Sequence, residues 1–225
     1  MVPRPGWARR IDPPVGGLEV ADAAVELTLG AVRGAFAAGA ITPGAAGAAG
    51  AAVLIVLVPC DERGSDSALE VVLIRRAAHL RANPGEIAFP GGRIEPGEAP
   101  LAAALREAEE EVALPAGAVE VLGELSSLSR LRGAAPIIAF VALAQGRPAF
   151  VANPDEVECV LVVPLAELVA PGRYWQERWD HAEAPAWTMH FFDLGEDVIW
   201  GATAQMLHAL FLRVLGRGVG VQVLA

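Results

Sequence analysis

Positive charge is scarce in this sequence. Lysine and arginine together number 17 against 27 acidic residues, so the 225-residue chain has a formal net charge of −10. Proteins that coat nucleic acids or adhere to anionic membranes need a basic surface. The composition therefore argues against both kinds of partner. A small anionic ligand is still compatible with it, because such a ligand requires only a few local arginines.

Cysteine is also rare. The chain has two, Cys60 and Cys159, which are too few for the disulfide frameworks of small secreted domains. Each lies in or beside an apolar run. We therefore expect both to be reduced core residues of a cytoplasmic protein.

A long uncharged segment, residues 34–60, is tempting as a membrane span. It contains Pro43 and several glycines, however, and its apolar residues gather at one end. A Gly/Ala-rich loop followed by a strand at 52–58 is the better interpretation. Near the N-terminus, Arg9 and Arg10 are not followed by an apolar core. We expect neither a membrane span nor a signal peptide.

Hydrophobic periodicity predicts a mixture of helices and strands. Helices are expected at 20–38, 99–112 and 201–215. Strands are expected at 52–58, 68–76, 119–125, 136–144, 157–165 and 187–194. The segment DERGSDS separates the first two strands, which should be antiparallel neighbours.

Two segments are expected to lack regular structure. Residues 1–17 are rich in proline and glycine, and the segment from His79 to Gly97 is a long loop of the kind that is usually functional or disordered. The length fits one domain with an extension. We assign 1–45 to an N-terminal extension with an amphipathic helix that would suit a homodimer, and 46–225 to the main domain.

Four glutamates stand close together in LREAEEEVAL, residues 105–114. At 100° per residue, Glu107, Glu110 and Glu111 fall within about a 100° arc of one helix face. Apolar residues occupy a separate arc that would pack on a sheet, namely Leu101, Ala104, Leu105, Ala108 and Val112. Like charges at this spacing cost an isolated helix a few tenths of a kcal/mol per pair. The simplest interpretation is a solvated helix face.

The segment directly upstream favours a metal site instead. It reads FPGGRIEPGE, so backbone carbonyls and Glu98 can reach the same place as the helix glutamates. Arg106 follows Glu98 by eight residues, and an arginine held by one glutamate can orient another. Hard oxygen ligands suit Mg²⁺ or Mn²⁺, which bind through a few carboxylates and the phosphates of a substrate.

The stretch Gly92–Leu114, GRIEPGEAPLAAALREAEEEVAL, resembles the signature of the Nudix hydrolases, G-x5-E-x7-R-E-U-x-E-E-x-G-U, in which U is apolar. The residues in register are Gly92, Glu98, Arg106, Glu107, Ala108, Glu110, Glu111 and Leu114. Ala113 departs from the pattern, because the family has glycine there. The departure concerns the turn that leaves the helix and removes no carboxylate.

This resemblance implies a Nudix fold, an α/β/α sandwich with a mixed β-sheet, and hydrolysis of a nucleoside diphosphate linked to another group. Arg106 and Glu98 would be an orienting pair. The general base stays open between Glu110 and Glu156, which lies in the acidic segment NPDEVE and is otherwise read as part of an ordinary turn. The implied metal ligands are Glu107, Glu110, Glu111 and the carbonyl of Gly92.

Residues 72–92, VLIRRAAHLRANPGEIAFPGG, resemble the extended motif of the coenzyme A diphosphatases in that family, L-L-T-x-R-[SA]-x3-R-x3-G-x3-F-P-G-G. Departures occur at Val72, Ile74 and Asn83. The implied substrate is coenzyme A or an acyl-coenzyme A, whose additional 3′-phosphate suits recognition by arginines with forked hydrogen bonds. The implied substrate-binding residues are Arg76, Arg81, Gly91 and Gly92.

Several alternatives stay open. The departures leave ADP-ribose, NADH and dinucleoside polyphosphates as substrates, and a nucleotide-sensing domain without catalysis is a further alternative. Arg76 and Arg81 can also be read as surface ion-pair partners of Glu70 or Glu86. His79 is a candidate ligand contact. An aromatic group is expected in the core and a hairpin, with stacking of one member on adenine as the alternative: Trp175, Trp179, Trp187, Phe191 and Phe192.

Overall fold

A computed structural model of the protein describes residues 8–11, 27–37, 50–60, 67–128, 136–181 and 184–216. Its helices are α2 (Leu29–Phe36), α3 (Pro100–Val112), α4 (Leu165–Leu168) and α5 (Gly201–Val214). Its strands are β1 (Ala8–Ile11), β2 (Ala51–Pro59), β3 (Leu69–Arg76), β4 (Ile87–Ala88), β5 (Gly91–Arg93), β6 (Val119–Leu128), β7 (Ile137–Ala144), β8 (Val157–Pro164), β9 (Tyr174–His181), β10 (Ala184–Asp193) and β11 (Val198–Ile199).

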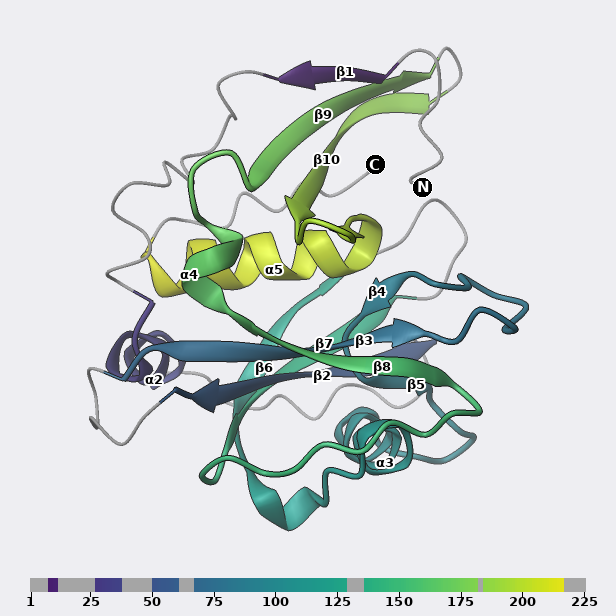
Figure 1. Ribbon diagram of the computed structural model, residues 1–225, viewed down its shortest axis with the longest axis vertical. Helices are drawn as coiled ribbons and strands as arrows, with labels where there is room; N and C mark the ends of the chain where they lie inside the picture. The colour runs from purple at the N-terminus through teal and green to yellow at the C-terminus, as the bar shows by residue number, and fades with distance from the viewer. Residues whose placement is uncertain are drawn as a thin grey trace.

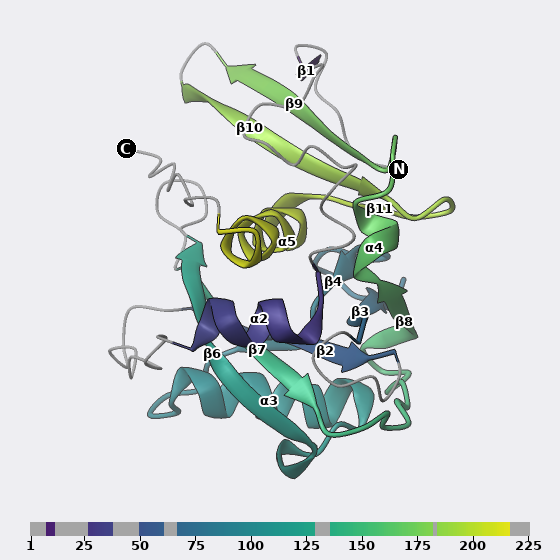
Figure 2. The ribbon, with the colours of Figure 1, turned by 90° about the vertical axis from the view of Figure 1, so that its left-hand side faces the viewer.

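The larger sheet has the order β4-β3-β2-β7-β6, with β5 paired to β2 and β8 paired to β3. Strands β2 and β7 run parallel and the other pairs are antiparallel, so the sheet is mixed, as expected. Helix α3 covers one face, and α2 and α5 cover the other (Figures 1 and 2). Alternation along β2 explains the two layers. Leu54 and Val56 belong to the core under α3, whereas Ile55 and Leu57 belong to the core under α2 and α5.

A second sheet, with the order β1-β9-β10-β11, lies on the opposite side of α5 from the larger sheet (Figure 1). Helix α5 therefore packs between two sheets, and this position explains why so much of its surface is buried. The sequence predicted β10 in part but not β9. The buried core around Tyr174 and Phe192 joins the second sheet to α5.

The structure corrects several expectations. Residues 8–11 form a strand, so at least this part of the segment 1–17 has regular structure. The segment from His79 to Gly97, expected to be a loop, contains β4 and β5. The helix expected at 20–38 begins at Leu29, because Thr28 caps it with a side-chain hydrogen bond to the N–H of Ala31. Residues 20–26 and 38, and the proposed domain boundary at 45–46, lie outside the described residues.

Neither cysteine is a core residue, which corrects the expectation for both. Cys60 is exposed where the chain leaves β2, and Cys159 is half-buried on β8. The two cysteines are not joined by a disulfide bond. Within the part of the chain that the structure describes, no helix has the length and apolar character needed to span a membrane.

Candidate active site

The glycine-rich turn before α3 passes unusually close to the sheet. At Gly91 φ is +152°, and a Cβ atom there would lie 2.5 Å from the Cα of Val53 on β2. Only glycine fits this close approach. The turn carries the N–H of Gly91 to the α3 carboxylate of Glu111, at an N···O distance of 2.8 Å. At Gly92 a Cβ atom would lie 2.5 Å from the carboxyl carbon of Glu107, so the backbone of Gly92 and this carboxylate are packed together.

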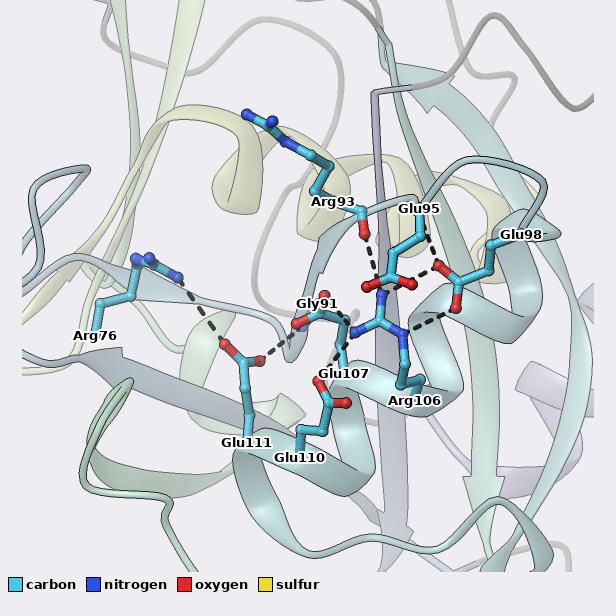
Figure 3. A network of polar contacts seen from close by, with 9 residues as sticks. All are labelled: Arg76, Gly91, Arg93, Glu95, Glu98, Arg106, Glu107, Glu110 and Glu111. Carbon is cyan, nitrogen blue, oxygen red and sulfur yellow. Dashed lines mark hydrogen bonds and ion pairs between the residues drawn. The ribbon is translucent and has the colours of Figure 1, made fainter.

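Arg106 is the centre of a polar network that ties α3 to the preceding turn (Figure 3). Its Nε and Nη2 donate to the two carboxylate oxygens of Glu98, at 2.9 and 3.1 Å. Its Nη1 donates to Glu107 and Glu110, both at 2.9 Å, and Nη2 also donates to the carbonyl of Arg93 at 3.2 Å. These hydrogen bonds hold the pKa of Glu98 below its usual value. Arg106 therefore fixes three carboxylates at once.

Three carboxylates converge beside this network. Glu107, Glu111 and Glu156 each place one oxygen within 4.8 Å of the others. Glu111 is 1% exposed, and burial raises its pKa to about 7, with the charges of Glu107 and Glu156 acting in the same direction. Burial also raises the pKa of Glu107. Crowded, partly desolvated oxygens of this kind need a cation to be stable when ionised, so their chemistry fits a hard divalent metal ion.

Glu156 reaches the helix glutamates through a short turn. The N–H of Asn153 donates to the carbonyl of Glu111 at 3.0 Å, which fastens the turn to the last residues of α3. The N–H groups of Glu156 and Val157 then donate to the carbonyl of Asn153, at 3.1 and 2.8 Å. The carbonyl of Glu156 accepts from the N–H of Ala77 at 2.9 Å, so its backbone is held on both sides.

Glu110 lies at the margin of the site. Its side chain is 55% exposed and pairs with Arg106, and it is not one of the three carboxylates that converge. The sequence proposed Glu110 both as a metal ligand and as a base. The geometry brings Glu156, rather than Glu110, next to Glu107 and Glu111.

The two substrate-side arginines come from the end of β3 and the loop that follows it. Arg76 lies 4.0 Å from the Glu111 carboxylate, and Arg81 is exposed. Within the described residues Arg81 makes no ion pair. The Glu70 carboxylate pairs with Arg147, which is against the alternative that Glu70 holds either arginine. His79 lies on the same loop, with its Nε2 atom 3.0 Å from the carbonyl oxygen of Asp155.

The aromatic group lies elsewhere. Its members belong to β9 and β10, and Figure 1 places those strands on the far side of α5 from α3. Trp179, Phe191 and Phe192 are buried there. The indole N–H groups of Trp175 and Trp179 donate to the carboxylate of Glu177, at 3.1 and 3.0 Å. This placement accords with the core-and-hairpin interpretation.

Comparison with known proteins places the site in a family. The model of the NUDIX domain matches residues 48–187, which is more than half of the chain. The chain belongs to the Nudix family. It is therefore a Nudix hydrolase, and its reaction is hydrolysis of a diphosphate linkage.

Relatives of this Nudix hydrolase include curated proteins and solved structures. "Uncharacterized Nudix hydrolase NudL" from Salmonella paratyphi B (strain ATCC BAA-1250 / SPB7) is 37% identical over 172 residues, which cover 73% of this chain and 82% of the relative. A Nudix hydrolase from M. smegmatis, RenU, is 26% identical, with a TM-score of 0.44 over 54% of this chain and 73% of that one. A MutT/nudix family protein from Enterococcus faecalis is 21% identical, with a TM-score of 0.49 over 74% and 62%.

Proposed function

We propose that this Nudix hydrolase cleaves the diphosphate linkage of coenzyme A or an acyl-coenzyme A. The products would be 3′,5′-ADP and 4′-phosphopantetheine or its acyl derivative. The observation that carries the proposal is the position of the substrate-side motif relative to the carboxylates. The N–H of Arg76 donates to the carbonyl of Glu86, and the N–H of Gly85 donates to the carbonyl of Arg76, both at 3.0 Å. The loop that bears Arg81 therefore begins and ends at the backbone of Arg76, whose side chain lies 4.0 Å from the Glu111 carboxylate.

The carboxylates would hold Mg²⁺ or Mn²⁺. Glu107, Glu111 and Glu156 would supply the central oxygens, with Glu110 and the carbonyl of Gly92 at the margin. A divalent ion bound there supplies charge neutralisation of the diphosphate and acidifies an attacking water. Arg106 would keep the carboxylates in place through the contacts described above. Arg76 and Arg81 would bind peripheral phosphate oxygens.

The general base is proposed to be a carboxylate, with Glu110 and Glu156 as the two candidates. One carboxylate oxygen of Glu110 already accepts a hydrogen bond from Arg106, so that oxygen is not free to contact an attacking water. Glu156 is exposed, and one of its carboxylate oxygens lies within 4.8 Å of those of Glu107 and Glu111. Separate Glu110→Gln and Glu156→Gln variants assign the role by the loss of kcat at saturating Mn²⁺, where weakened metal binding no longer contributes to the loss. If the protein were a nucleotide-sensing domain, the wild type would show no turnover, and the Glu110→Gln variant would still bind the nucleotide.

The substrate is tested with a hydrolysis panel. Coenzyme A, acetyl-coenzyme A, ADP-ribose, NADH and a diadenosine polyphosphate are offered with Mg²⁺ and with Mn²⁺, and products are identified by chromatography and mass. Preferential release of 3′,5′-ADP is expected. Cleavage of ADP-ribose or NADH alone would overturn the coenzyme A proposal and retain the Nudix chemistry.

The role of the arginines is tested by comparing coenzyme A with dephospho-coenzyme A, which lacks the 3′-phosphate. The wild-type protein should prefer coenzyme A in kcat/KM. The Arg76→Gln and Arg81→Gln variants should lose that preference, because their contribution is specific to the extra phosphate. Arg33→Gln is the matched control, since Arg33 forms a two-armed pair with Glu120 away from the motif. A preference unchanged in both motif variants would remove the arginines from recognition.

A further inference from the structure

Arg75 precedes Arg76 on β3, and successive side chains of a strand point to opposite faces. Arg76 faces the carboxylates of α3, whereas Arg75 is held by two acidic residues from other elements. Its Nη1 donates to Oε1 of Glu158 on β8 at 3.1 Å, and its Nη2 contacts the carboxylate of Asp197. All three side chains are less than half exposed. Arg75 thus links three segments that are distant in the sequence.

The pairing of β3 with β8 changes register at this arginine. Arg75 stands opposite Cys159 and Arg76 stands opposite Val157, so Glu158 is an additional residue in β8. An additional residue of this kind is a β-bulge, which bends the strand and redirects the side chains next to it. Arg75 holds the bulged residue by its side chain. The ion pair therefore fixes the place at which the register changes.

The bulge determines where Glu156 points. Glu156 immediately precedes β8, and its carbonyl accepts from the N–H of Ala77 beyond the end of β3. A slip of one residue in a strand moves its side chains to the opposite face. With the bulge at Glu158, the Glu156 carboxylate lies within 4.8 Å of those of Glu107 and Glu111. Without the bulge, the same backbone contacts would direct this carboxylate elsewhere.

Asp197 connects the same arginine to the second sheet. It immediately precedes β11, and its carbonyl accepts from the N–H of Leu194 at 2.9 Å, which closes a turn between β10 and β11. Strand β11 lies against β4, the two-residue strand that pairs with β3 at Ile74 and Arg75 (Figure 2). The second sheet thus reaches β3 indirectly, through β4 and through the contact of Asp197 with Arg75.

We propose that Arg75 is a positioning residue of the metal centre. Together with Glu158 and Asp197 it holds the β8 bulge in register, and through the bulge it keeps the Glu156 carboxylate beside Glu107 and Glu111. The inference rests on the proposed function in one respect, because it takes these three glutamates as the metal ligands. It does not depend on which diphosphate is cleaved.

The test is a double-mutant cycle on metal binding. Mn²⁺ alone is titrated into the full-length protein without substrate, and free Mn²⁺ is followed by electron paramagnetic resonance. The proteins are the wild type, Arg75→Gln, Glu156→Gln and the double variant. Arg33→Gln, which removes the pair with Glu120, is the control. If circular dichroism shows that Arg75→Gln does not fold, Glu158→Gln replaces it, because that change removes only one arm of the contact.

Arg75→Gln should weaken Mn²⁺ binding by about 10–100-fold, the usual effect of removing a group that orients a metal ligand. The double variant should bind no more weakly than Glu156→Gln alone, because Arg75 acts through Glu156, and Arg33→Gln should bind as the wild type does. Losses that multiply in the double variant, or wild-type affinity in Arg75→Gln, would overturn the proposal. A wild-type protein that binds Mn²⁺ but leaves coenzyme A uncut would overturn the substrate proposal alone.

Discussion

Glu111 is a carboxylate with almost no access to water. Burial is the main reason that its pKa rises to about 7, while the N–H of Gly91 and the charge of Arg76 act in the opposite direction. An ionised group at this position destabilises the metal-free protein. The proposed metal binding would explain why a carboxylate lies here, whereas folding would not. This gives a test in which stability and activity should change in opposite directions.

The Glu111→Gln variant should unfold less readily and hydrolyse less. At pH 8 without metal, a neutral amide replaces a buried charge and can still accept from Gly91, so the free energy of unfolding should rise by about 1–3 kcal/mol. Hydrolysis should fall by at least about 100-fold, since even outer partners of a metal ligand cost roughly 10–100-fold. Urea unfolding in EDTA and steady-state kinetics measure the two effects. Glu109→Gln, at an exposed glutamate of the same helix, should change neither, and equal behaviour of the two variants would contradict the prediction.

At Gly91 an added side chain would cost stability both through its overlap with β2 and through backbone strain, and these two contributions can be measured separately. Gly91→Ala should lower the free energy of unfolding by roughly 3 kcal/mol, because the methyl group would overlap the backbone of β2. Gly97 also has a positive φ, +82°, but a Cβ atom there would meet open space. Gly97→Ala should therefore cost only about 1 kcal/mol. Chemical denaturation of both variants measures the difference, and equal losses would show that strain alone accounts for the effect at Gly91.

At this scale the sequence was informative where geometry is local. Helical spacing placed Glu107 and Glu111 on one face, since 100° per residue holds in any regular helix. The position of Glu156 depends on a turn and a bulge much further along the chain, so its acidic segment offered only a candidate. The carbonyl of Arg93, which accepts from Arg106, was not predicted because every residue carries a carbonyl.

Among the elements, helix α3 is followed by an alanine in a backbone conformation that alanine does not favour. Ala113 has φ +55° and ψ +36°, the left-handed region, and its N–H donates to the carbonyl of Glu109 at 3.0 Å. This is the position at which the Nudix signature has glycine. Alanine in place of the signature glycine has therefore kept the same turn after α3, and Ala113 carries the backbone strain.

Ala113→Gly should stabilise the protein by about 1 kcal/mol, because glycine adopts the left-handed conformation without a Cβ penalty. An alanine-to-glycine substitution inside the helix should instead lower the free energy of unfolding. Ala102 is an exposed helical residue of α3, and Ala102→Gly should destabilise by about 1 kcal/mol. Urea unfolding of both variants measures the change in the free energy of unfolding relative to the wild type. A loss of stability in both would mean that the cap is not strained.

The elements that the sequence predicted are those with a long, regular hydrophobic pattern. Helix α3 and strand β7 are examples, and both agree with their expected ranges within one residue. Strands β4 and β5 have only two and three residues in a segment rich in glycine and proline. Partners far along the chain hold them in the sheet, and no periodicity can reveal this. Strand β9 was not predicted for another reason, since YWQERWDH mixes aromatic and polar residues without regular alternation and buries some of both.

In the whole molecule, the interface between α5 and the second sheet contains a pair of uncharged histidines. The rings of His190 and His208 stack at a centroid distance of 3.9 Å, and the Nδ1 atom of His190 lies 2.8 Å from the hydroxyl of Tyr174. Burial lowers the pKa of His190 to about 3 and that of His208 to about 4, with the second imidazole adding to the effect at His190. Both rings are therefore neutral in the folded protein near neutral pH.

These lowered pKa values make the interface sensitive to acid. The unfolded chain takes up protons near the ordinary histidine pKa of about 6.5, whereas the folded protein does so only near 3–4, so stability is complete above about pH 6.5 and falls as the pH drops below it. At pH 5 the loss should be about 2 kcal/mol for each histidine. The raised pKa of Glu111 contributes in the opposite direction over part of this range, so variants must be compared with the wild type at each pH.

The His208→Gln variant isolates the effect. Between pH 7 and pH 5 the wild-type protein should lose about 2 kcal/mol more unfolding free energy than this variant, because one titrating ring is removed and the contribution of Glu111 cancels in the difference. Urea denaturation at the two pH values measures it. Phe211→Leu, a buried substitution on the same helix, should lower stability equally at both. If the unfolding free energy of His208→Gln depended on pH as strongly as that of Phe211→Leu, His208 would not be the source of the acid sensitivity.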